Sequence, residues 1–260
     1  MVEDISWKFI CWASFLGEVS MEEPLAVIIN TCNRPYLLKT AVGQITEQTK
    51  DGDRLIIVND GKEGTLPEFQ DEKICSIEHC KPYYALASAR NAGLSKALTL
   101  GYDWGVFVDD DIEVVEGWLN THRKAWTDKE TMYAGKILGS KDSSYDIRTV
   151  WAGEEGNLKD GEVPKNFLVQ MGGCNFGCYL PSLEEVGGFN EEFDGNYGYE
   201  DVELAYRLTQ LHGWGVQYLS EAAMLNRQAP PSGNYARNIS ENREKIVEKV
   251  PKELMWDGFI

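Results

Sequence analysis

Short apolar runs alternate with stretches of helical apolar spacing through the first half of the chain. Four apolar runs predict strands of a sheet: residues 25–30, 54–59, 74–78, and 106–108 just before Asp109. After the first run, Pro35 suits the first turn of a helix, and Leu38, Val42 and Ile45 recur at helical spacing. A second helix is predicted from about Leu86 to Leu100. This alternation predicts an α/β fold with a doubly wound, mostly parallel sheet and helices on both faces.

The second half of the chain has shorter apolar runs separated by polar turns. Short strands are expected at residues 132–138, 148–151, 167–171, 175–180, 216–219 and 222–225. Ser182–Glu185 has the spacing of a capping box and predicts a short helix that stops at Gly187 and Gly188. Glu200 and Asp201 precede another helix, and one more is expected at about 240–249. We expect these short strands to form a smaller antiparallel sheet on the acceptor side.

No linker, repeat or low-complexity tract divides the chain. We therefore expect one domain at residues 25–226, an N-terminal extension at 1–24 and a C-terminal segment at 227–260 that packs on the domain. Two explanations of the C-terminal segment stay open. It is either a flap that orders over a bound ligand or an exposed tail.

Residues 1–20 are rich in aromatic and apolar side chains but lack the basic start and the cleavage site of a signal peptide. No run in the chain has the length of a membrane span. The segment fits an interfacial helix, a dimer contact, a helix packed on the domain, or a start codon placed upstream of the true one. We expect a soluble, cytoplasmic protein, with peripheral membrane association through residues 5–16 as an alternative.

The length, composition and net charge of the chain restrict the classes of protein to which it can belong. The chain has 260 residues, 43% of them hydrophobic, and a formal net charge of −17. Such a charge argues against bulk binding to nucleic acid through a general basic field. The six cysteines show no zinc spacing, and Cys174 and Cys178 suit small core positions, so a reducing compartment is expected.

Three adjacent carboxylates, Asp109, Asp110 and Asp111, follow the apolar run Val106–Val108. A buried strand that ends in acids delivers them to the carboxyl edge of a parallel sheet, where open α/β folds bind ligands. Neighbouring anions repel one another, and Mg²⁺ or Mn²⁺ relieves that repulsion through oxygen coordination. The alternative is a solvated acidic turn.

Six segments in order resemble the motifs of glycosyltransferase family 2, which has the GT-A fold. They are 27–35, 57–61, 89–93, 109–111, 187–191 and 200–204. The likeness extends over about residues 25–226. It implies a metal-dependent, inverting glycosyltransferase that uses a nucleoside-diphosphate sugar, with a UDP-sugar favoured.

The resemblance also assigns roles to single residues. It implies that Asp60 accepts the N3–H of a uracil ring, although an Asp-Gly turn is the simpler alternative. The other residues assigned to the nucleotide are Thr31, Asn33, Arg34, Arg90, Asp109 and Asp110.

For the metal, Mn²⁺ or Mg²⁺, the resemblance implies Asp111, with Asp109 on the ribose or on the metal. Asn226 aligns with a position where many relatives carry a histidine ligand, and an amide oxygen is a poorer ligand. Gly173, Arg227 and Arg237 are predicted near the donor or acceptor sugar, with one of the two arginines on the phosphates.

The resemblance favours Asp201 as the base that deprotonates the acceptor and Glu200 as a residue that orients it. Simple helix N-terminal charge is the alternative for this pair. Two other functions stay open at this point: an Asp-x-Asp phosphohydrolase, and a binding module that keeps the fold without turnover. The sequence leaves the acceptor, a glycan, protein or small molecule, and the oligomeric state undetermined.

Overall fold

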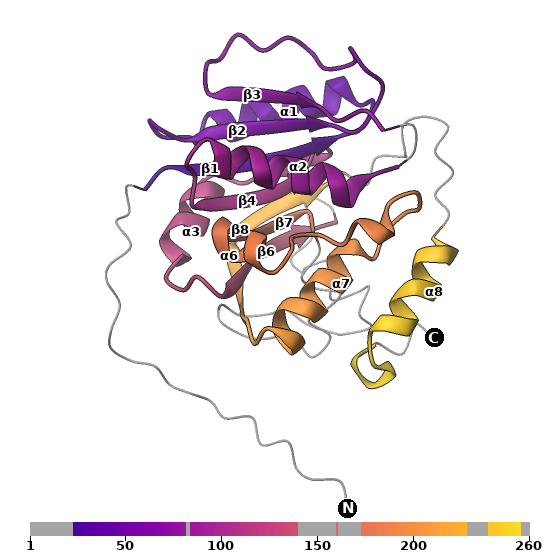
Figure 1. Ribbon diagram of the computed structural model, residues 1–260. Coiled ribbons are helices and arrows are strands. Elements are labelled where there is room, and N and C mark those ends of the chain that lie inside the picture. Colours follow the sequence, from indigo (N-terminus) through magenta and orange to yellow (C-terminus); the bar gives the residue numbers. More distant parts are fainter. Residues whose placement is uncertain (1–22, 82–83, 140–159, 161–172, 228–238, 256–260) are drawn as a thin grey trace, which may run out of the picture.

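The computed structural model describes residues 23–81, 84–139, 160, 173–227 and 239–255. Its first half alternates strands and helices as the apolar pattern predicts (Figure 1). The elements are β1 (Leu25–Thr31), α1 (Pro35–Thr46), β2 (Arg54–Asn59), β3 (Ile74–Glu78), α2 (Leu86–Thr99) and β4 (Trp104–Asp109). Then follow β5 (Ile112–Val114), α3 (Trp118–Ala125) and β6 (Thr131–Leu138).

The described second half contains β7 (Asn175–Tyr179), α6 (Leu180–Glu185), η1 (Glu191–Phe193) and α7 (Glu200–Tyr206). A π-helical turn, η2 (Arg207–Leu211), continues α7 and leads into β8 (Gly215–Asn226). The chain continues with α8 (Ser240–Lys249) and η3 (Lys252–Leu254).

The strands form one eight-stranded sheet in the order β3-β2-β1-β4-β7-β6-β8-β5. The strands β3, β2, β1 and β4 are mutually parallel, as expected. The antiparallel pairings join the same sheet: β7 runs against both β4 and β6, and β5 runs against β8. The register pairs Asn30 with Asp109 and Thr31 with Asn59, so the carboxyl ends of β1, β2 and β4 lie side by side.

Each face of the sheet has its own apolar core. Alternate residues of β1 point to opposite faces, so Ile28 lies in the core that includes residues of α2, α6 and α7, and Ile29 in the core that includes residues of α1 and α3. The two layers of helices cover the sheet in Figure 1, with α8 beside α7. Cys178 is completely buried and Cys174 nearly so, which confirms both as core residues.

Three local predictions were wrong or incomplete. The helix predicted to open at Ser182 begins at Leu180, because Pro181 suits its first turn and no side-chain cap is needed there. The two strands predicted at 216–219 and 222–225 are one strand, β8, since a bulge opposite Gly135 and Ile137 accommodates the polar residues between them. Helix α3 was not expected. The strands predicted at 148–151 and 167–171, and residues 1–22, lie outside the described residues.

Candidate active site

The site lies at the shared carboxyl edge of β1, β2 and β4. Thr31 ends β1, Asp60 directly follows β2, and Asp109 ends β4. The backbone N–H of Asp60 donates to the Thr31 carbonyl at 2.8 Å, which ties the two strand ends together. The residues predicted from separate motifs therefore meet at one edge.

Asp60 has one carboxylate oxygen engaged and one unengaged. Its Oδ2 accepts the backbone N–H of Ala85 at 2.9 Å, just before α2. Its Oδ1 is buried and has no hydrogen-bond partner among the described residues. Burial raises the pKa of Asp60 to about 7, and the Ala85 hydrogen bond offsets part of that effect. A buried acceptor without a partner is costly, so this oxygen is suited to an N–H from a ligand.

The loops after β1 and β2 lock together through Asn33. Its backbone is left-handed, with φ 55°, and its Oδ1 accepts the Lys62 N–H at 2.7 Å. A Cβ on Gly61 would lie 2.6 Å from that Oδ1, so only glycine allows this approach. Asn33 therefore shapes the backbone beside Asp60.

Arg34 pairs with two of the three acids. Its Nη2 lies 2.5 Å from Asp110 Oδ1, and its Nη1 lies 3.0 Å from Asp111 Oδ2. Burial lowers the pKa of this guanidinium, but the Asp110 and Asp111 charges outweigh burial and raise it above its usual value. Asp110 is fully buried and also accepts the Thr31 hydroxyl at 2.6 Å. Burial raises the pKa of Asp110 to about 7, against the lowering effect of Arg34 and Thr31.

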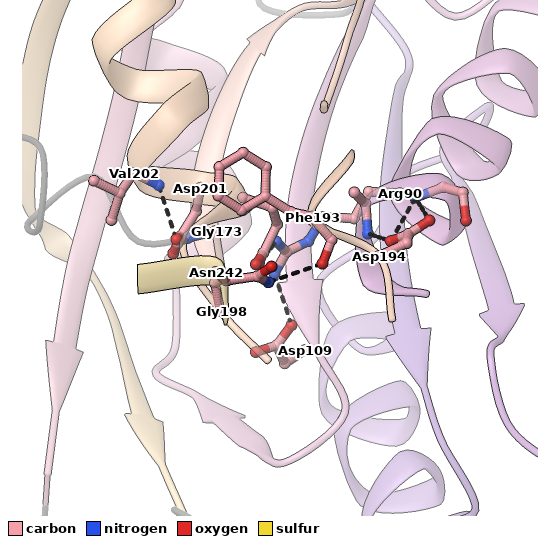
Figure 2. A network of polar contacts seen from close by, with 12 residues as sticks. Arg90, Asp109, Gly173, Phe193, Asp194, Gly198, Asp201, Val202 and Asn242 are labelled. Carbon is pink, nitrogen blue, oxygen red and sulfur yellow. Dashed lines mark hydrogen bonds and ion pairs between the residues drawn. The ribbon is translucent and has the colours of Figure 1, made fainter. Parts of the chain in front are cut away.

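Arg90 joins the two acid pairs of the sequence. From α2 it places Nη1 2.6 Å from Glu200 Oε1. Its Nη2 lies 3.3 Å from Asp109 Oδ1 (Figure 2). Its side chain is 2% exposed. Burial lowers the pKa of Arg90, but the Glu200 and Asp109 charges raise it well above its usual value.

Gly173 lies against this guanidinium. A Cβ there would come 2.5 Å from Arg90 Nη1, so a larger residue would displace the guanidinium. Its backbone N–H donates to Asp201 Oδ2 at 2.9 Å. Gly173 thus lies between the Arg90 guanidinium and Asp201.

Glu200 and Asp201 begin α7 but face different surroundings. Glu200 is 4% exposed, and burial raises its pKa to about 7, with Asp201 raising it further and Arg90 opposing the rise. Asp201 is partly exposed, and its Oδ1 accepts the Val202 N–H at 2.8 Å. Tyr199, directly before the pair, adopts φ 71°, a left-handed conformation that is uncommon for a bulky residue. Such strained backbone is frequent at functional sites.

The last predicted residues lie at the end of β8. Asn226 pairs with Ile112 across the sheet, one residue from Asp111. The Arg227 N–H donates to the Asp111 carbonyl at 2.8 Å, and its Nη2 lies 2.6 Å from Glu113 Oε1. Arg237 lies outside the described residues.

Sequence reasoning missed two residues that organise the site. Asp194 accepts the Ala87 N–H at 3.0 Å and so caps α2 from 107 residues away. Asn242 of α8 is fully buried and holds the segment before Glu200. Asp194 precedes Gly195 and looks like an ordinary turn residue, and a polar residue inside a polar helix gives no signal at all.

The described part of the chain has neither a ready-made metal-binding cluster nor a membrane-spanning helix. In it, no three His, Cys, Asp or Glu side chains are grouped to hold a metal ion by themselves. None of the helices described is both long and apolar enough to cross a bilayer.

Comparison with known proteins identifies the family. The model of glycosyl transferase family 2 matches residues 26–180. The chain belongs to this family. The match covers the strands that carry Thr31, Asp60 and Asp109, and it ends at the start of α6.

One relative of this family 2 chain is the GalNAc(5)-diNAcBac-PP-undecaprenol beta-1,3-glucosyltransferase of Campylobacter jejuni. It is 28% identical over 180 residues, which is 66% of this chain and 56% of the relative. The family 2 chain therefore spans little more than half the length of that protein.

Two solved structures share the fold of the family 2 chain. The mannosyltransferase PcManGT of Pyrobaculum calidifontis, in complex with GDP-Man and Mn²⁺, has a TM-score of 0.60 at 18% identity, covering 90% of this chain and 67% of that one. GalNAc-T7 with UDP, GalNAc and Mn²⁺ has a TM-score of 0.59 at 16% identity, covering 78% and 44%. Both are glycosyltransferase structures, and the likeness confirms the GT-A fold.

Proposed function

We propose that this family 2 chain transfers a sugar from a nucleoside-diphosphate sugar, with UDP favoured, to an acceptor hydroxyl with inversion at the anomeric carbon. The observation that carries the proposal is the bridge made by Arg90. Its guanidinium contacts Asp109, at the edge of the parallel strands, and Glu200, beside Asp201. A donor site and an acceptor base lie next to each other in such an arrangement, as in-line transfer requires. The family assignment sets aside the phosphohydrolase alternative.

We assign the nucleobase of the sugar donor to the side of the site that holds Asp60. The buried Oδ1 of Asp60, which has no hydrogen-bond partner among the described residues, supports pairing with the N3–H of uracil. Thr31 and Asn33 shape the backbone around that position through the contacts of their strand ends and loops. The Asp110 carboxylate is already engaged by Arg34 and by the Thr31 hydroxyl, so we assign it a positioning role, holding Arg34 beside the donor. Asp109 stays the proposed ribose contact if it does not bind the metal.

A divalent metal is assigned to Asp109 and Asp111. Carboxylates are the hard oxygen donors that Mn²⁺ and Mg²⁺ prefer, and two of them fit an ion that takes its remaining ligands from substrate phosphates. Asn226, one position from Asp111 across the sheet, is the proposed additional ligand. When bound, such an ion would neutralise the charge that develops on the departing diphosphate. The solved neighbours that contain Mn²⁺ support this assignment.

The acceptor side is assigned to Asp201. Asp201 takes the proton of the acceptor hydroxyl. The oxygen of that hydroxyl forms the new bond to the anomeric carbon while the bond from this carbon to the diphosphate oxygen breaks. The partial exposure of Asp201 supports this role. Glu200 was expected to orient the acceptor, but its carboxylate is buried against Arg90. We therefore assign Glu200 to positioning Arg90. Gly173 lines the site through its backbone.

The phosphates and the acceptor complete the proposal. Arg227, whose backbone N–H donates to the Asp111 carbonyl, stays the proposed phosphate contact, with Arg237 as the second candidate. The Campylobacter relative is named for a polyprenyl-diphosphate-linked glycan, which makes a glycan hydroxyl the first acceptor to test. Location in the cytoplasm and a role for residues 5–16 at a membrane stay predictions.

Donor binding tests the proposal directly. We expect titration calorimetry to show UDP binding with Mn²⁺ and a loss of at least about tenfold in affinity with chelator, because the diphosphate then meets unscreened carboxylates. Asp111→Asn should reproduce that loss without a change in melting temperature larger than that of Asp51→Asn, an exposed control. Equal UDP affinity with and without Mn²⁺ would contradict the metal role. UDP-glucose should also release UDP slowly in Mn²⁺, whereas a binding module would bind the donor and release none.

The pH dependence of donor binding tests Asp60. Because Oδ2 already accepts the Ala85 N–H, the proton of a neutral Asp60 would sit on Oδ1 and block pairing with the uracil N–H. The affinity for UDP-glucose should therefore rise as the pH passes the Asp60 pKa of about 7. If only the ionised form binds, the ionised fractions give a gain of about tenfold between pH 6 and pH 8. Calorimetry at constant Mn²⁺ measures this gain. The diphosphate ester of UDP-glucose does not titrate in this range, unlike the terminal phosphate of UDP.

Asp60→Asn is the matched control for this measurement. Its amide oxygen keeps the Ala85 N–H, so its NH₂ group faces the ligand, repels the uracil N–H and removes the pH dependence that Asp60 causes. In the protein without ligand, the contribution of Asp60 to stability depends on pH with the opposite sign. The raised pKa means that the stability contribution of Asp60 is present below its ordinary value of 3.8 and is lost as the pH rises through about 7. A pH profile identical in wild type and Asp60→Asn would refute the uracil assignment.

A further inference from the structure

The segment between η1 and α7, residues 194–199, carries Glu200 and Asp201 into the site without regular secondary structure. Three of its six residues have left-handed backbone: Gly195 at φ 92°, Gly198 at φ 81° and Tyr199 at φ 71°. A segment of this kind makes few repeating backbone hydrogen bonds. Its shape is therefore set by groups outside it.

Asn242 of α8 binds the backbone just before this segment and near its end. Its Nδ2 donates to the Phe193 carbonyl at 2.8 Å and to the Gly198 carbonyl at 2.9 Å (Figure 2). A side-chain amide has two N–H donors, and both are used here. Asn242 is completely buried, so water does not replace these bonds. The Gly198 carbonyl is only two residues before Glu200.

The opposite side of the segment is held by α2. Asp194 accepts the Ala87 N–H at 3.0 Å, and the Gly195 N–H donates to the Tyr84 carbonyl at 2.6 Å. Helix α2 carries Arg90, the partner of Glu200. Residues 193–198 are thus a bridge between α2 and α8, and both helices act on the same pair of acids.

Helix α8 is anchored firmly enough to act as a fixed point. Ile246 and Val250 are buried in the core that contains α2, α6 and α7. At its edge, Lys249 Nζ lies 2.7 Å from Glu192 Oε2. The helix lies beyond the part of the chain that matches the family model, which ends at residue 180.

We infer that α8 is a positioning element for the reaction, in which Asn242 fixes the segment that aims Asp201 at the acceptor hydroxyl. The inference rests on the proposed transferase function. Among the described residues, no hydrogen bond joins Asn242 to an assigned donor residue or to Asp201, and it acts through the 193–198 backbone. Its removal should therefore lower kcat and leave donor affinity unchanged, because Asp60, Asp109 and Asp111 are held by strands of the parallel sheet.

The test compares Asn242→Asp with Leu119→Ala. The aspartate has the same shape but no N–H donors, so it loses both bonds and adds a charge facing two carbonyls. Leu119 lies in the core of the opposite face and serves as a control for a general loss of stability. Asn242→Ser keeps one hydrogen-bond donor and leaves room for water. It replaces the aspartate variant in the test if that variant does not fold.

Two readouts decide the outcome. Hydrogen exchange should quicken in residues 195–204 of the Asn242 variant while β1, β2 and β4 stay protected. UDP release from UDP-glucose in Mn²⁺ at 25 °C should fall about ten- to a hundredfold in kcat, as misplacement of a catalytic group predicts. The affinity for UDP should stay as in wild type, and Leu119→Ala should keep its kcat.

Unchanged exchange, unchanged kcat, or a parallel loss of kcat and UDP affinity would each overturn the inference. Failure of the proposed function looks different, because the unmodified enzyme would then release no UDP from any sugar nucleotide. In that case the positioning of the acids is judged by the exchange of residues 195–204 alone.

Discussion

Asp201→Asn is expected to lower kcat by about a hundredfold to ten-thousandfold, the range that general-base assistance usually contributes. This corresponds to about 3–5 kcal/mol in the barrier of the chemical step. The amide keeps an oxygen that can accept from Gly173 or Val202, so the start of α7 should hold its shape. It has no basic group to take the acceptor proton. Single-turnover sugar transfer or UDP release measures the loss.

The affinity for UDP is the internal control, because Asp201 acts on the acceptor and not on the diphosphate. Calorimetry should give the same UDP affinity for Asp201→Asn, for wild type and for Glu184→Gln, an exposed acid of α6. Glu200→Gln should cost less than Asp201→Asn, since Glu200 acts through Arg90. If Glu200→Gln abolishes transfer while Asp201→Asn keeps most of it, the two roles are reversed. If both variants turn over normally, the base lies elsewhere.

Arg90→Met is expected to lower the free energy of unfolding by about 3–5 kcal/mol, the usual cost of removing one partner of a buried ion pair. Its guanidinium is 2% exposed and is the charge partner of both Glu200 and Asp109. Without it, the carboxylates are left unpaired at the centre of the site. Their pKa values, already raised by burial, should rise further. Urea unfolding measures the stability loss, and transfer should fall with it.

Arg123→Met is the matched control. Arg123 is likewise buried, and its Nη2 lies 2.7 Å from Asp53 Oδ2. Asp53 also accepts the Leu25 N–H, so this pair lies at the start of β1, the opposite end of that strand from Thr31. We expect a similar stability loss with kcat retained at temperatures where the variant is folded. Adding Glu200→Gln to Arg90→Met should recover part of the stability, because it removes one unpaired buried charge. Wild-type stability in Arg90→Met would contradict the role of Arg90 as the central counter-ion.

The strands of the first half could be predicted from the sequence alone because their burial is a local property of the pattern. A parallel strand covered on both faces reads as a nearly continuous apolar run, so β2 was predicted with the bounds that the structure has. The bounds of β3 were also predicted, but from a weaker pattern, because this edge strand is only partly buried. The same reasoning placed Asp60 and Asp109 at strand ends, and parallel pairing brings such ends to one edge. The acids of the donor side were thus predictable as a group. Strand β8 was not, since its bulge depends on its neighbour β6.

Only the tertiary structure decided how the two acid pairs are connected. Arg90 and Glu200 are 110 residues apart in the chain. The local periodicity of the sequence therefore could not predict that one guanidinium contacts both Glu200 and Asp109. The cap of α2 by Asp194 and the two hydrogen bonds of Asn242 are also long-range contacts. Apolar periodicity reports which side of an element is buried. Which buried polar groups meet is set by how the helices pack against the sheet, because each such group must find a partner wherever the fold places it.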